Sequence, residues 1–179
     1  MKSGHLWAVG YDQMERAEQV RAEIAKLAER HCLILLDTAV AVRYADGPVT
    51  LDGIPFLGPV TFSGRIANFL AGLALGAPPL TEAAAGVMVR SIGGAAGAVG
   101  IEDGFVNEVQ ALMKPGTSAL FVLDDEGDME MILHAIRGLG GKVVKTNVDL
   151  ERAKLIQSAL ADAMADSANK APANPEASS

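Results

Sequence analysis

The apolar positions of the first 55 residues follow two periods in turn. Residues 5–11 are a short aromatic and aliphatic run, which is typical of a buried strand. Apolar positions then recur every three to four residues among charged ones, which predicts an amphipathic helix capped by Asp12. Its buried stripe comprises Ala17, Val20, Ile24 and Leu27. A long strand is expected over 32–44, followed by a turn and a hairpin strand at 49–51. Residues 1–55 thus predict a first βαβ half with a hairpin strand.

Strand and helix patterns alternate again over residues 102–166. The expected elements are a helix at 103–113, a strand at 118–123, a helix at 129–136, a strand at 142–146 and a C-terminal helix capped by Asn147 or Asp149. These elements form a second half that echoes the first. Residues 167–179 are small, polar and proline-bearing, so they cannot offset their ordering entropy and are expected to be disordered.

Two βαβ halves that interleave in one sheet define the split βαβ arrangement. Right-handed crossovers would place both crossover helices on one face of the sheet. The sequence therefore predicts an α+β fold, a ferredoxin-like split βαβ sheet domain, with a Gly/Ala-rich helical-hairpin insertion at 56–101.

This middle segment contains nine glycines and only three charged residues, and Pro78-Pro79 divides it into two arms. The first arm, 62–77, would form a helix of about 24 Å, shorter than the roughly 30 Å apolar core of a bilayer. The second arm, 81–100, is long enough, but Arg90 near its centre would cost about 2.5–3.5 kcal/mol. A transmembrane hairpin is therefore not favoured.

Glycines in both arms recur at helical spacing. They are Gly72 and Gly76 in the first arm, and Gly86, Gly93, Gly97 and Gly100 in the second. A glycine stripe lets two helix backbones approach closely, within the hairpin or between subunits, and this would offset the cost of glycine in a helix. The alternative is a flexible loop rich in small residues. We predict helix association at these six positions.

Net charge and cysteine content limit the binding partners and the cellular compartment that we expect for this protein. The formal net charge of −7 repels phosphate backbones, so no nucleic-acid partner is expected. Cys32 is the only cysteine, which fits a reducing cytoplasm. The first ten residues lack the apolar run of a secretory signal, and the mature chain is expected to start there.

Four kinds of local pattern resemble a functional site, and each has a structural explanation. His31-Cys32 has no ligand spacing, and the acidic residues 124–130 precede a helix whose dipole favours them. The glycines of 93–97 and 138–142 fit no phosphate-loop pattern. Asp37 could be half buried in its strand, but no partner base is near in sequence. We predict no catalytic residue, no metal and no cofactor.

Several longer segments carry a resemblance to a known family. They are LILLDTAVAVRYADGPVTL, IEDGFVNEV, LMKPGTSALFVL and GGKVVKT, separated by the Gly/Ala-rich middle. In this order they resemble the bacterial domain-of-unknown-function family 1269, over nearly all of the chain except the tail. Members are often labelled predicted membrane proteins, and the resemblance implies no established activity. Arg65, Glu82 and Arg90 make this middle segment less lipid-like.

The sequence favours a non-enzymatic protein that self-associates through its glycine-rich helices. It is expected to be a cytoplasmic homo-oligomer, with contact to the inner membrane surface left open. The alternative is a regulatory module that binds a small ligand on a ferredoxin-like oligomeric core, for which an apolar pocket with convergent polar groups would be the sign. An enzyme using Asp37 or the acidic segment is the third hypothesis.

Overall fold

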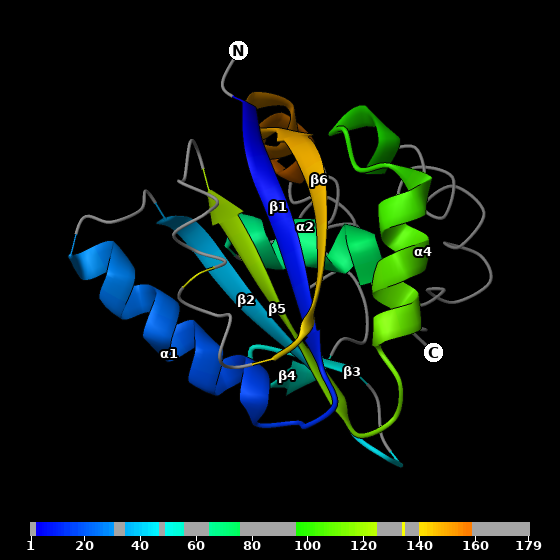
Figure 1. Cartoon of the computed structure of the whole chain (residues 1–179). Coiled ribbons are helices and arrows are strands. Elements are labelled where there is room, and N and C mark those ends of the chain that lie inside the picture. The colour runs from blue at the N-terminus through cyan, green and yellow to red at the C-terminus, as the bar shows by residue number, and fades with distance from the viewer. Residues whose placement is uncertain are drawn as a thin grey trace, which may run out of the picture.

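The computed structural model describes residues 3–30, 35–46, 49–55, 65–75, 96–124, 134 and 140–158, and its fold is α+β as predicted (Figure 1). The elements are β1 (Ser3–Tyr11), α1 (Arg16–Glu29), β2 (Leu35–Arg43), β3 (Val49–Leu51), β4 (Ile54–Pro55), α2 (Ile66–Leu75), α4 (Asp103–Leu112), β5 (Thr117–Asp124) and β6 (Lys142–Asp149). Residues 150–158 are helical as well.

Six strands form one sheet in the order β4-β3-β2-β5-β1-β6, and every neighbouring pair is antiparallel. It follows that β1 and β2 run in the same direction with β5 between them. By the same reasoning β5 and β6 run in the same direction with β1 between them. Strands from the two ends of the chain therefore interleave in a single sheet, and the predicted hairpin of β2 with β3 is confirmed.

Alternation along the strands gives the sheet two apolar faces. The central strand β5 is buried at every position, with Phe121 on one face and Leu120 and Val122 on the other. On the second of these faces, Trp7 and Val9 pack with the apolar stripe of α1, which includes the predicted Ala17, Val20 and Ile24. Because successive strand residues point to opposite faces, the strands contribute side chains to two separate core clusters, one on each face of the sheet.

Helices cover both faces of the sheet (Figure 1). α1 packs on β1, β2 and β5, whereas α2 and α4 pack together on the opposite side. α2 comes from the Gly/Ala-rich middle and is buried on nearly every side, so part of that segment belongs to the core. The helix expected at 129–136, which would complete the second crossover, lies outside the described residues except His134.

The side chain of Asp37, a charge that the sequence suggested could be half buried, contacts the start of helix α2. Its carboxylate accepts hydrogen bonds from the backbone N–H of Ala67 at 3.0 Å and of Thr38 at 2.9 Å, and it pairs with Arg65. Asp37 is only 8 % exposed and lies where the β2–β5 register shifts. Because Oδ2 caps the start of α2 through the Ala67 N–H and Oδ1 accepts from Thr38 and Arg65, the structure gives this buried charge a structural role.

Helix α1 is capped from a distant strand. The Ser118 hydroxyl accepts a hydrogen bond from the Ala17 N–H at 3.2 Å and donates one to the Gln13 carbonyl at 2.6 Å. Glu15 is the N-cap residue and makes no side-chain capping bond, so the prediction that Asp12 caps this helix is wrong. At the last helix the predicted capping by Asp149 is confirmed, because its carboxylate accepts the Arg152 N–H at 3.1 Å.

Candidate functional site

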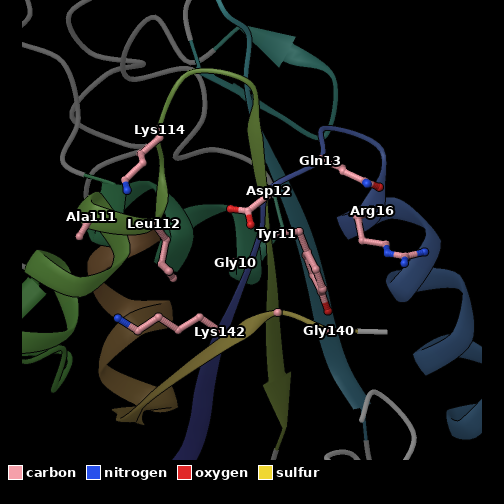
Figure 2. A pocket seen from close by; sticks show the side chains of 11 residues that line it. Gly10, Tyr11, Asp12, Gln13, Arg16, Ala111, Leu112, Lys114, Gly140 and Lys142 are labelled. Atoms are coloured by element: carbon pink, nitrogen blue, oxygen red, sulfur yellow. The ribbon is translucent and has the colours of Figure 1, made fainter. Parts of the chain in front are cut away.

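A cavity of about 690 Å³ lies where β1 ends and β6 begins (Figure 2). Its volume is in the range of sites that hold small-molecule ligands. Its described lining comes from the end of β1 and the following loop, the end of α4, and the start of β6. These residues are Gly10, Tyr11, Asp12, Gln13, Arg16, Ala111, Leu112, Lys114, Gly140, Gly141 and Lys142.

Glycines allow the three segments to approach one another. At Gly10, an added Cβ would lie 2.8 Å from Leu112 Cδ2, so the absent side chain makes room for α4 against β1. At Gly141, φ is +105° and an added Cβ would lie 2.7 Å from Cε1 of Tyr11. Only glycine fits this combination of left-handed backbone and close contact. The position of the β6 start against Tyr11 therefore depends on Gly141.

The described lining carries more positive than negative charge. Arg16 is the first residue of α1, Lys114 follows the end of α4, and Lys142 is the first residue of β6. Asp12 carries the one carboxylate among the described lining residues. Figure 2 shows Lys114 and Lys142 on the side of α4 and Arg16 on the side of α1, with Asp12 between them. An anion in the cavity would meet cations from both sides.

Tyr11 forms part of this wall. Its side chain is 6 % exposed, and its hydroxyl oxygen is buried, with no hydrogen-bond partner within the described part of the chain. Burial raises the pKa of Tyr11 to about 12, and the charge of Arg16 opposes the shift. The hydroxyl therefore keeps its proton at neutral pH.

The raised pKa predicts a loss of stability in alkali that Tyr11→Phe removes. Tyrosine in an unfolded chain has a pKa of about 10, so between pH 10 and 12 the unfolded state loses a proton that the folded state keeps. The free energy of unfolding should fall by about 2–3 kcal/mol over this range because of Tyr11. Urea unfolding at pH 9 and pH 11.5 measures the difference between wild type and variant. Parallel pH profiles of the two proteins would contradict the prediction.

A second cluster of polar side chains lies at the end of β1 opposite to the cavity. Asp124 is fully buried, and its carboxylate accepts a hydrogen bond from Trp7 Nε1 at 3.1 Å. His5 Nδ1 lies 3.0 Å from the other carboxylate oxygen, and the His5 side chain is 34 % exposed. Lys145 lies over the Trp7 ring, 5.1 Å from its centroid. This network fixes the start of β1 against the end of β5, and it is separate from the cavity lining.

Three of the six glycines predicted to associate helices are described. Gly72 is buried in α2, and Gly97 is exposed, with no atom of the described residues within 4 Å of an added Cβ. Gly100 has φ +91° and lies in a turn against β6, where an added Cβ would be 3.1 Å from the Asn147 carbonyl oxygen. Gly76, Gly86 and Gly93 lie outside the described residues, so helix association stays a prediction.

The other sequence patterns have mixed outcomes. His31-Cys32 and residues 93–95 of the glycine-rich stretch 93–97 lie outside the described residues, as does the acidic segment after Asp124. Of the segment 138–142, the described residues Gly140, Gly141 and Lys142 line the cavity, although they match no phosphate-loop pattern. Within the described chain, no group of three histidine, cysteine, aspartate or glutamate side chains could hold a metal ion.

Sequence reasoning missed most of the cavity because its residues are far apart in the chain. Asp12 was assigned to a helix start, Arg16 lies within the helix expected after it, and Lys114 directly follows the helix expected at 103–113. Each of these roles is common at the end of an element. The available signal was the clustering of glycine and lysine at element ends, at 114–116 and 140–142.

Comparison with known proteins identifies a family without a known activity. The family model described as protein of unknown function (DUF1269) matches residues 61–161, which is more than half of the chain. The chain belongs to the DUF1269 family. This confirms the resemblance seen in the sequence, although the match begins after β4. No curated protein and no solved structure matches the chain.

The region matched by DUF1269 supplies only one side of the cavity. It includes Lys114 and Lys142, whereas Asp12 and Arg16 precede it. Among the helices that the structure describes, none is both long enough and apolar enough to cross a membrane.

Proposed function

We propose that this DUF1269 protein binds a small anionic ligand in the cavity at the end of the sheet. The observation that carries the proposal is the charge of the described lining, where Arg16, Lys114 and Lys142 accompany the one carboxylate of Asp12. The whole chain has the opposite balance, with 15 basic and 22 acidic residues. A cluster of cations on an acidic protein supports a local role for that charge.

The charges that line the cavity determine its affinity for an anion, because salt screens the charges that lie farther away. At physiological ionic strength the screening length is about 8 Å, so distant carboxylates contribute little to the potential in the cavity. Arginine and lysine form their strongest hydrogen bonds with carboxylate and phosphate oxygens.

The proposed role is binding without chemical conversion of the ligand. The described lining contains no histidine, cysteine or serine that would serve as a nucleophile or a paired base. This supports the regulatory module named as the alternative from the sequence, and it makes ligand occupancy the quantity to measure.

Titration with inorganic pyrophosphate tests the proposal. We expect wild type to bind it in isothermal titration calorimetry at physiological ionic strength, and Arg16→Gln with Lys142→Gln to weaken binding by at least about tenfold. Lys145→Gln is the matched control, because it removes one positive charge from the same strand, β6, outside the described lining. Its affinity should stay within roughly twofold of wild type.

Two results would overturn the proposal. One is the absence of pyrophosphate binding by folded wild type. The other is an equal loss of affinity in Lys142→Gln and Lys145→Gln, because binding would then follow net charge and not the cavity.

We further propose that the sheet is ferredoxin-like at its centre. The order β2-β5-β1-β6, with β1 parallel to β2 and β5 parallel to β6, supports this topology. The helices α2 and α4 on the opposite face would then be additions to the two-layer arrangement.

Self-association in the cytoplasm, with contact at the inner membrane surface, is a second proposal. Gly97 supports it, because this position is exposed and no atom of the described residues would block a second helix within 4 Å of an added Cβ. Light scattering of the purified protein tests it, and the mass of a single chain at all concentrations would contradict it. Carbonate washing of membranes tests the membrane contact separately.

A further inference from the structure

We infer that the ligand of the cavity is a ribonucleoside phosphate, an inference that rests on the proposed anion-binding function. A cavity of about 690 Å³ is larger than a single inorganic anion requires and matches an organic ligand. The described lining is also divided into regions of different chemistry, and each region suits one part of a nucleotide.

The side of the cavity near α4 suits the phosphate groups. Lys114 and Lys142 reach it from different elements, with Leu112 on the same wall (Figure 2). Lysine binds phosphate as a point charge, so two lysines can share a diphosphate without fixed geometry.

Asp12 is the residue that distinguishes this ligand from a simple anion. Its carboxylate would repel inorganic phosphate or pyrophosphate, and it costs affinity unless the ligand offers hydrogen-bond donors. Vicinal ribose hydroxyls are such donors, and a carboxylate accepts hydrogen bonds from both. Asp12 lies between the lysines and the α1 side, where the sugar of a bound nucleotide would lie (Figure 2).

The side near α1 suits the base. The Gln13 amide both donates and accepts hydrogen bonds, as the edge of a base requires, and the planar guanidinium of Arg16 can stack on a base face. The Tyr11 ring forms part of the same wall and supplies aromatic surface. Ligand charge, hydroxyl donors and a planar ring are therefore each matched by different residues of the lining.

The test compares adenosine 5′-diphosphate, its 2′-deoxy form and inorganic pyrophosphate on wild type and Asp12→Asn. Asp12 is exposed and does not cap α1, so the variant should fold, and its thermal unfolding checks this. On wild type we expect the ribonucleotide to bind about tenfold more tightly than pyrophosphate, and more tightly than the deoxynucleotide. Uridine and guanosine diphosphates in the same assay then identify the base.

Asp12→Asn should move the two affinities in opposite directions. Pyrophosphate binding should tighten because a repulsive charge is removed, whereas ribonucleotide binding should weaken by about tenfold because two charged acceptor oxygens are replaced by one neutral acceptor oxygen and an NH₂ donor. A ratio of ribonucleotide to pyrophosphate affinity that is unchanged or higher in the variant would overturn the inference. Pyrophosphate binding without any ribonucleotide preference overturns it and leaves anion binding intact, whereas no binding of any probe overturns both.

Discussion

Asp124→Ala is expected to lower the free energy of unfolding by about 3 kcal/mol. The carboxylate is fully buried and accepts hydrogen bonds from Trp7 and His5, so alanine would leave the indole N–H unpaired in the core. A buried donor without a partner costs about 1–3 kcal/mol, and removal of one member of a buried polar pair costs more. The effect should be large because the network joins the start of β1 to the end of β5.

Trp7 is the only tryptophan, so its fluorescence in a urea titration measures this effect at the site itself. Asp124→Asn keeps one acceptor oxygen and should recover part of the loss. His5→Ala is the control for the exposed side of the network and should cost less than Asp124→Ala, since His5 is one-third exposed. A loss below about 1 kcal/mol for Asp124→Ala would contradict the expected role of the carboxylate.

Gly141→Ala is expected to cost about 2–4 kcal/mol and to disturb the cavity wall. The left-handed backbone penalises any residue with a Cβ by about 1–2 kcal/mol. The added methyl group would also lie 2.7 Å from Tyr11 Cε1 and 2.8 Å from Val9 Cγ1, so packed side chains in the core must shift. The two costs have separate causes and should add.

The neighbouring glycine separates these two costs. Gly140 also has a left-handed backbone, with φ +73°, but an added Cβ there meets no atom of the described residues within 4 Å. Gly140→Ala should therefore show only the backbone cost, about 1–2 kcal/mol. Equal losses in the two variants, measured by urea unfolding, would show that the contact with Tyr11 is unimportant.

Local elements were predictable from the sequence because they follow local periods. The apolar stripe of α1, the run that forms β5 and the hairpin after β2 all carry their signal within a few residues. Lengths of strands were less predictable, since β6 continues past the expected end at residue 146 to Asp149. The additional residues pair with the start of β1, and that partner lies more than 100 residues away.

Long-range partners were not predictable, and they determine the roles of the polar residues. Ser118 lies within a strand pattern, yet its hydroxyl caps a helix 101 positions earlier. Asp124 was assigned to an acidic helix start, yet it is a buried acceptor for Trp7. The same holds for the cavity, because neither Asp12 nor Lys142 has a local motif and the sheet alone brings them together.

The position of β1 between β5 and β6 has a consequence for the boundaries of the family. A fragment cut to the matched residues 61–161 would retain β5 and β6 but lose the strand that hydrogen-bonds to both. Because β2 is lost as well, both edges of β5 and the edge of β6 that pairs with β1 would be unsatisfied, and the apolar surface that α1 covers would be exposed, so we expect the fragment to aggregate when expressed alone. We therefore expect the strands that precede residue 61 to unfold cooperatively with the matched segment that follows them.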